Sequence, residues 1–179
     1  MKKVNFHPLM KSFCTGLITL LISAPSVADP VSINVTGNII AAPCEVSSDS
    51  INKTIALDGG NGFQATDFQA AGAASSWVTF DITLKNCPEG TTATIITFSG
   101  TPDSDHPEDM YANSGTAKNV AVQLQGSGGH QFGNGKSFTN HAISDGISPF
   151  HLKTRAYTNK GGVTPGTIQA VVTANFTYQ

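Results

Sequence analysis

The chain has few cysteines, and they are not arranged as a metal site. Three cysteines occur in 179 residues, at Cys14, Cys44 and Cys87. Zinc sites use Cys or His ligands at short spacing, whereas Cys44 and Cys87 stand 43 positions apart with no histidine between them. The spacing makes zinc binding a weak interpretation, and we expect no metal.

Catalytic motifs are also absent from the sequence. The nearest approach to a phosphate-binding loop is the segment 129–137, in which His130 occupies a position that the motif reserves for glycine. The sequence contains neither the nucleophile elbow around a serine nor the paired histidines of a zinc-protease helix. We therefore expect that the protein is not an enzyme and uses no cofactor.

The acidic residues near position 105 do not form a recognisable calcium loop. Asp103, Asp105, Glu108 and Asp109 lack the glycine and the terminal glutamate of an EF-hand at the required spacing. A solvated acidic turn is the expected structure. Surface positions on loops or strand ends are expected for four histidines: His106, His130, His141 and His151.

Residues 1–28 have the pattern of a secretory signal peptide. Three lysines precede an apolar run over residues 13–22, and small residues at Ser26 and Ala28 indicate cleavage after Ala28. A membrane anchor would need about 20 unbroken apolar residues. The run here is about half as long and is followed by Pro25, so we expect export of the chain.

The chain that remains after this cleavage is expected to be one acidic domain of 151 residues with one disulfide. It retains seven Lys or Arg residues and all 12 acidic residues, a net charge of −5 that argues against nucleic acid or an anionic membrane surface as the partner. Cys14 is removed with the signal peptide, so Cys44 and Cys87 are left to pair in an oxidising compartment. Closing a loop of this length contributes about 4 kcal/mol in the chain-entropy model.

Short alternating segments separated by turn residues predict an all-β sandwich. Residues 78–85 alternate cleanly, and further apolar runs cover 95–98, 120–124 and 150–156. No helical pattern of ten residues interrupts them. The breakers lie at 58–62, 101–103, 126–129 and 160–162, and Pro43 and Pro88 suit strand margins.

The last residues predict a long strand with one apolar face. After Gly166, every second residue to the chain end is apolar, which is the period of a half-buried strand. An uncovered apolar edge invites pairing with another chain, so we expect an outside segment to cover it. The apolar positions are Ile168, Ala170, Val172, Ala174, Phe176 and Tyr178.

The segment after the cleavage site alternates too and has two interpretations. Residues 29–40 could form the first strand of the same sandwich. They could instead be an extension that donates a strand to a neighbouring chain, because they begin at the cleavage site and the C-terminal strand lacks a cover. The positions on one side are Val31, Ile33, Val35, Gly37 and Ile39.

Several motifs jointly resemble the pilins of the chaperone–usher pathway, most closely the minor tip subunit of type 1 fimbriae. They are the alternating extension 31–39, Ala42-Pro43-Cys44, the segment 71–77, Leu84-Lys85-Asn86-Cys87-Pro88, the segment 113–120, Gly166 at the fourteenth position from the end, and the penultimate Tyr178. The resemblance covers the whole chain after residue 28. It implies an incomplete immunoglobulin-like sandwich whose missing strand is donated by a neighbouring subunit.

The resemblance also implies site residues and partners. The donor positions would be Val31, Ile33, Val35, Gly37 and Ile39, and the acceptor groove would include Gly166 and the apolar face from Ile168 to Tyr178. The domains would be a signal peptide (1–28), an N-terminal donor extension (29–40) and a pilin domain (41–179). The implied partners are a periplasmic pilus chaperone, an outer-membrane usher and neighbouring fimbrial subunits, including an adhesin or adaptor. The chain would function as a structural subunit of an adhesive fimbria on the bacterial cell surface.

A second class of function remains open at the level of sequence. A self-contained secreted sandwich that binds carbohydrate would be a monomer with residues 29–40 in its own sheet. Trp77 could then stack on a sugar ring, although its position at the start of an alternating strand favours a core or inter-sheet residue.

Overall fold

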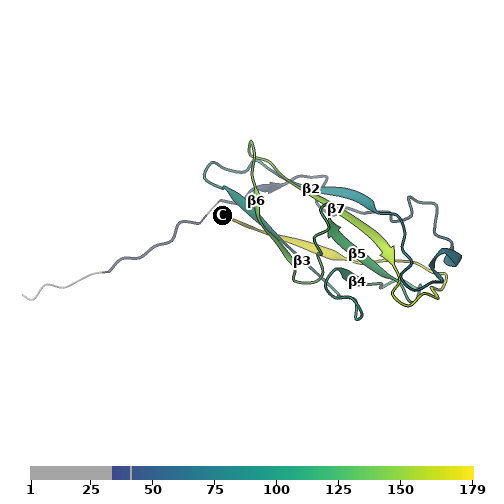
Figure 1. The fold of residues 1–179 in the computed structure, drawn as a ribbon. Coiled ribbons are helices and arrows are strands. Elements are labelled where there is room, and N and C mark those ends of the chain that lie inside the picture. The colour runs from purple at the N-terminus through teal and green to yellow at the C-terminus, as the bar shows by residue number, and fades with distance from the viewer. Residues whose placement is uncertain (1–33, 41) are drawn as a thin grey trace, which may run out of the picture. The chain divides into compact units, whose positions relative to one another are not determined.

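The computed structural model describes residues 34–40 and 42–179 (Figure 1). It divides into two compact units, Met1–Gly37 and Asn38–Gln179. In the first unit only residues 34–37 are described, and they have no regular secondary structure.

The second unit is built almost entirely of β-strands, as the alternating sequence predicted. One 3-10 turn, η1, is its only helical element among the described residues. The elements in chain order are β1 (Glu45–Val46), η1 (Ala65–Phe68), β2 (Val78–Lys85), β3 (Ala93–Gly100), β4 (Met110–Ala112), β5 (Ala121–Gly126), β6 (Ser137–Ala142), β7 (Ser148–Tyr157) and β8 (Val172–Tyr178).

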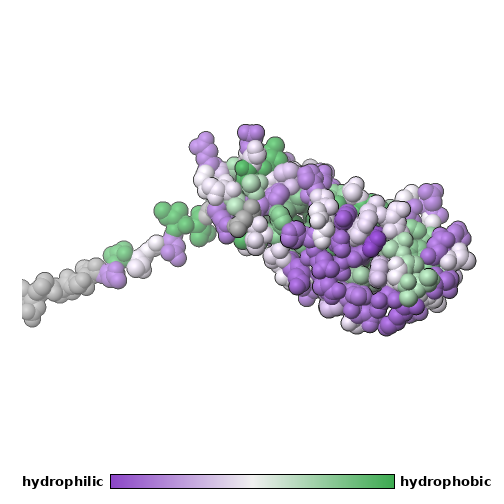
Figure 2. All heavy atoms as spheres, viewed as in Figure 1, coloured by the Kyte–Doolittle hydropathy of each residue, from purple (hydrophilic) through white to green (hydrophobic). Residues whose placement is uncertain are grey.

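These strands form two antiparallel sheets (Figure 1). One sheet has the order β1-β2-β7-β5-β4, and the other has the order β6-β3-β8. Successive side chains along a strand point to opposite faces of the sheet. Each sheet therefore directs one apolar face inward and one largely polar face outward. On the face that Figure 2 shows, hydrophilic residues predominate over the domain.

The main core lies between the two sheets. Its central side chains come from β2, β3, β5 and β7, and their burial is almost complete for Leu84, Ile96, Phe98 and Leu152. A second, smaller cluster around Phe68, Ala117, Val120, Ala156 and Val163 packs under the loops at one end of the domain. The fold is an immunoglobulin-like sandwich with this core at its centre.

The two sheets are joined along the side where β4 lies. The backbone N–H of Ala112 donates to Thr101 O at 3.0 Å, and the N–H of Asp103 donates to Met110 O at 2.9 Å. The chain leaving β3 therefore pairs with β4, which itself pairs with β5 in the other sheet. This pairing closes the sandwich on that side.

The strands predicted at 78–85, 95–98, 120–124 and 150–156 are confirmed as β2, β3, β5 and β7. Pro43 precedes β1 and Pro88 follows β2, at strand margins as predicted. The predicted breaker at 58–62 is a turn in which Asp58 accepts the backbone N–H groups of Gly60 and Gly62 at 2.9 and 3.0 Å. Within the part of the chain that the structure describes, no helix is long and apolar enough to span a membrane.

Candidate functional site: the open edge of β8

One edge of β8 has no strand beside it among the described residues. Its other edge pairs with β3 along the whole length of the strand, from Thr94 opposite Tyr178 to Gly100 opposite Val172. In sheet order β8 stands at the end of its sheet, and the short β1 stands at the end of the other sheet. A row of backbone N–H and C=O groups is therefore available for another strand.

The inward face of β8 is apolar and incompletely covered. Phe176 packs against Phe150 with ring centroids 5.9 Å apart, and every inward residue contacts the main core. Those residues are only half-buried, whereas Ile96 and Phe98 of the neighbouring β3 are fully buried. Apolar surface that one more strand would cover is thus present along β8. The inward residues are Val172, Ala174, Phe176 and Tyr178.

The start of β1 and the disulfide lie next to the end of β8. Cys44 and Cys87 are bonded to each other, and Cys44 is buried in the main core. The Tyr178 hydroxyl donates to Cys44 O at 3.3 Å, and burial raises the pKa of that tyrosine. The disulfide therefore ties the start of β1 to the segment after β2, and the Tyr178 hydrogen bond ties it to the end of β8.

The segment before β8 is fixed by a different set of contacts. The N–H of Ser114 donates to Gln169 O at 2.8 Å, and the N–H of Ala117 donates to Thr167 O at 3.1 Å. Gly166 allows this close approach, because a Cβ atom there would lie 2.4 Å from the Ala117 nitrogen. This end of the predicted groove is thus held against the 113–117 loop.

The regular strand is shorter than the alternating sequence indicated. The alternation begins at Ile168, but β8 begins at Val172, because residues 166–169 pair with the 113–117 loop instead of β3. Ile168 packs against the second cluster, while Ala170 packs against the main core. The predicted groove residues therefore divide between the two clusters.

The predicted donor segment is only partly described. Val31 and Ile33 lie outside the described residues. Val35 is 86% exposed and Ile39 is fully exposed, and a Cβ atom built at Gly37 would meet nothing within 4 Å. Residues 34–40 have no strand assignment, so the assignment of residues 29–40 as a donor or as a first strand stays a prediction.

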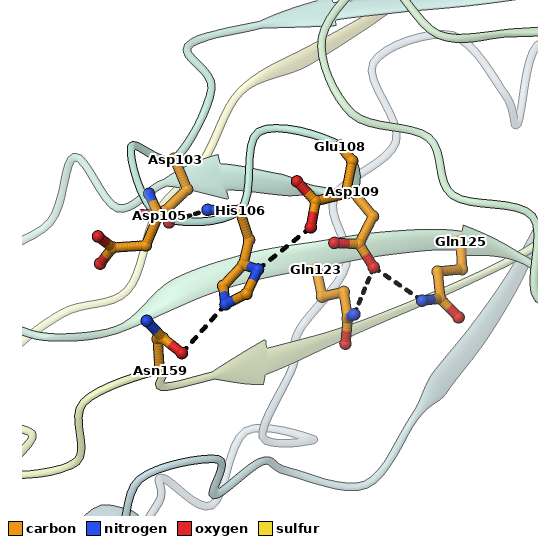
Figure 3. Close-up of polar contacts among 8 residues, drawn as sticks. All are labelled: Asp103, Asp105, His106, Glu108, Asp109, Gln123, Gln125 and Asn159. Carbon is orange, nitrogen blue, oxygen red and sulfur yellow. Dashed lines mark hydrogen bonds and ion pairs between the residues drawn. The ribbon is translucent and has the colours of Figure 1, made fainter.

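A second group of polar residues lies in the loop that joins β3 to β4 (Figure 3). The His106 ring is bracketed by two oxygens, with Nδ1 3.1 Å from Glu108 Oε1 and Nε2 3.0 Å from Asn159 Oδ1. Only the protonated ring carries an N–H on both nitrogens, so the bonds to Asn159 and Glu108 raise the His106 pKa. The loop is thereby attached to the segment that follows β7.

The prediction of a solvated acidic turn was wrong for Asp109. This carboxylate is 2% exposed, and its Oδ2 accepts bonds from Gln123 Nε2 at 2.5 Å and Gln125 Nε2 at 2.8 Å (Figure 3). Asp105 does remain exposed. The alternation of Gln123 and Gln125 on one face of β5 was the sequence signal for a polar partner there.

Trp77 also lies elsewhere than predicted. It belongs to neither hydrophobic cluster and is half-buried. The Arg155 guanidinium carbon lies 4.2 Å from the centroid of the indole ring, and Lys153 Nζ lies 4.8 Å from it. The tryptophan therefore packs with two cations from β7 and is not a core residue.

The histidines do not all lie at the surface, in contrast to the prediction. His141 is half-buried in β6, where its ring stacks on Phe150 at 4.3 Å. His130 stacks on Phe132 at 6.3 Å, while exposed His151 faces Asp81 at 2.7 Å. Within the described ranges, no group of three or more Cys, His, Asp or Glu side chains is placed to hold a metal ion.

Comparison with known proteins identifies the family. A model described as fimbrial protein matches residues 33–179. The chain is 37% identical over 169 residues to protein FimG of Escherichia coli K12, covering 94% of this chain and 96% of FimG. It is 36% identical over 166 residues to the S-fimbrial adhesin protein SfaS of Escherichia coli O6:K15:H31 strain 536, covering 92% and 94%.

The fold also matches a solved pilus subunit. The P pilus rod subunit PapA superposes with a TM-score of 0.64 at 27% identity, covering 77% of this chain and 100% of that one. Family, length and fold thus agree with the incomplete sandwich described above. The chain belongs to the fimbrial protein family and is a structural subunit of a fimbria.

Proposed function

We propose that this subunit polymerises by donor-strand exchange, with residues 29–40 as the donor and the open edge of β8 as the acceptor. The observation that carries the proposal is the half-buried apolar face of β8, whose second edge has no partner among the described residues. The exposed apolar residues Val35 and Ile39 supply a matching segment. Strand addition joins such parts without a catalyst or a cofactor, so the subunit acts without enzymatic activity.

Both side chains and backbone contribute to this joint. The donor presents four Val or Ile side chains, each worth roughly 1.5–3 kcal/mol when fully buried, or about 6–12 kcal/mol together. Backbone hydrogen bonds from the donor strand to the edge of β8 and to the edge of β1, at the end of the other sheet, add about 0.5–1.5 kcal/mol each. A joint of this kind should dissociate very slowly.

The proposal assigns partners in sequence. A periplasmic chaperone covers the edge of β8 after export, an outer-membrane usher receives the complex, and the extension of the next subunit replaces the chaperone. The subunit then lies in a fimbria on the cell surface, between neighbours that include an adhesin or adaptor. We assign it to a minor tip-fibrillum or adaptor position, because its motifs resemble those of the minor tip subunit of type 1 fimbriae.

Deleting residues 29–40 tests whether the donor function lies in this segment and the acceptor function lies at β8. The shortened chain retains β8 and should still bind the chaperone, but it should not insert into the preceding subunit. The measurement is chaperone co-purification from periplasm together with the amount of subunit in sheared fimbriae. Incorporation at the normal level would refute the donor assignment, and a stable chaperone-free monomer of the full chain would refute the open groove.

Gly37 tests the register of the donor strand. It is the one donor position without a side chain, so Gly37→Trp should overpack against the groove and cost about 1–3 kcal/mol. The matched control is Asn34→Gln on the outward side, which should stay within about 0.5 kcal/mol. Strand exchange between peptides of residues 29–43 and a chaperone-bound acceptor measures both effects. Equal exchange by the wild-type and Gly37→Trp peptides would exclude this register.

A further inference from the structure

The face of β8 that points away from the core is polar except at one residue. Successive side chains of a strand point to opposite faces, and Ala170 and Val172 pack against the main core. Val171 between them therefore points outward, and it is 72% exposed. It is the one apolar member of the outward series, which consists of Gln169, Val171, Thr173, Asn175 and Thr177.

The donor segment has the same pattern on the side away from its donor positions. Ile40 follows Ile39, so in an extended strand it points to the opposite face, and it is 86% exposed. Among the described residues, the other members of that face are polar: Asn34, Thr36 and Asn38. Each strand thus carries one apolar residue on its outward face, and that residue lies near one end.

Antiparallel pairing brings these two ends together. Every strand pair in the described part of the chain is antiparallel, and a donor that continues this arrangement runs opposite to β8. Its C-terminal end, with Ile40, then lies at the start of β8, beside Val171. A parallel donor would bring Ile40 to the other end of β8, where the outward residues Asn175 and Thr177 are polar.

The backbone of β8 places Val171 where side chains of neighbouring strands are closest. Gln179 N donates to Ala93 O at 2.9 Å and Gln179 O accepts from Ala93 N at 3.3 Å, so the backbone groups of Gln179 face β3. These groups alternate between the two edges, and Val171 stands an even number of positions earlier, so its groups face β3 too. Opposite a donor on the free edge, Val171 forms a non-hydrogen-bonded pair, in which the Cα atoms lie about 4.5 Å apart.

We infer that Ile40 of one subunit packs on Val171 of the subunit whose groove its donor strand fills, and that this outward contact sets the register of the joint. The contact rests on the proposed strand exchange, with a second copy of this chain as the partner. A shift by two residues would place Ile40 opposite polar Gln169 or Thr173, which loses the apolar cross-strand pair. In the inferred register the other outward pairs are polar on both strands: Asn38 with Thr173, Thr36 with Asn175, and Asn34 with Thr177.

The surface beside Val171 has room for the incoming side chain. Val171 borders a hollow of about 310 Å³, which is also lined by Thr101, Ala112 and Ser114. An isoleucine side chain can therefore lie across Val171 without displacing a neighbouring strand. Both side chains lose apolar surface to the contact, which favours the joint in proportion to the area covered.

Disulfide trapping tests the register directly. A peptide of residues 29–43 with Ile40→Cys is exchanged into the chaperone-bound full chain carrying Val171→Cys. The peptide has no other cysteine, and Cys44 and Cys87 of the chain are already bonded to each other. Mild oxidation should cross-link most of the inserted peptide. Acceptors with Gln169→Cys or Thr173→Cys, at the adjacent outward positions, should cross-link at least about fivefold less, because diagonal Cβ atoms lie too far apart for a disulfide.

Peptide release measures whether the two side chains act on each other. The Ile40→Asn peptide should leave the wild-type acceptor roughly two- to fivefold faster than the wild-type peptide in guanidinium chloride. In a Val171→Asn acceptor the two peptides should be released at equal rates, because the partner is already missing. Ile51→Asn is the matched control, since Ile51 is also an exposed apolar residue, and it should leave the difference between the peptides unchanged.

The outcomes separate this contact from strand exchange itself. A wild-type peptide that does not insert would overturn the donor assignment and this contact together. Insertion with the strongest cross-link at position 169 or 173 would overturn the inferred register and leave strand exchange in place. Equal release of the Ile40→Asn and wild-type peptides from the wild-type acceptor would likewise overturn the contact alone.

Discussion

Linking the donor segment to the end of its own chain should produce a self-complemented and markedly more stable subunit. Residues 29–40 are placed after Gln179 through a flexible turn of about five residues, long enough for a hairpin. A strand that turns back from the end of β8 runs antiparallel to it, along the edge that lacks a partner among the described residues. The linked strand then acts at a high effective concentration.

The size of the effect follows from what the strand covers. Four Val or Ile side chains against the half-buried face of β8 supply about 6–12 kcal/mol before the cost of ordering the strand. If a third of this free energy remains after the cost of ordering the strand, the gain in stability is about 2–4 kcal/mol. For a domain of this size, each kcal/mol raises the melting temperature by about 2–4 °C, so an increase of roughly 4–16 °C is expected.

Thermal unfolding of linked and unlinked chains measures this increase. A control carries the same graft with Val35→Asn and Ile39→Asn, which removes two apolar contacts and keeps length and linker. The melting temperature of the linked chain should be independent of protein concentration, and the control should lose most of the gain. An equal increase in graft and control would show that the gain does not come from apolar side chains entering a groove.

Three further predictions concern the rest of the domain. Asp109→Ala leaves two glutamine amides without their acceptor and should lower the unfolding free energy by about 2–4 kcal/mol in urea titrations, whereas exposed Asp67→Ala should change it by less than about 0.5 kcal/mol. Gly115→Ala would place a Cβ 2.1 Å from a backbone oxygen and should cost about 1–3 kcal/mol, while Gly128→Ala has open space and should be neutral; equal unfolding curves would contradict the packing. The pKa of His106 is raised above 6.5, so its stabilising contribution is complete below about pH 6.5 and is lost as the pH rises through the folded-state pKa. His106→Gln should remove that loss from the melting temperature–pH profile, and an unchanged profile would exclude His106 as its source.

The strands that could be predicted were those with clean alternation and a buried face. Residues 78–85 and 172–178 show period two because one face of each strand meets the core. The short strands β1, β4 and β6 were missed, because two or three residues carry no period and residues 137–142 are mostly polar. Their pairing is set by partners far away in sequence.

The errors at Asp109 and Trp77 have a related cause. Both positions follow local patterns that predict the opposite burial, since acidic neighbours suggest exposure and a strand start suggests a core residue. Asp109 is buried because β5 brings Gln123 and Gln125 to it, and Trp77 lies outward because β7 offers two cations there. Tertiary partners of this kind cannot be read from a local window.

The unequal edges of the two sheets explain why growth of the fibre should be linear. β4 is three residues long and is also paired with the chain leaving β3, so its edge offers little to another subunit. β8 is seven residues long, presents an apolar face, and has a free edge among the described residues. On the proposed mechanism each chain has one acceptor and one donor. A head-to-tail contact of that kind joins different surfaces of the two chains, so it generates an open, unbranched filament wherever the rotation between subunits does not close a ring.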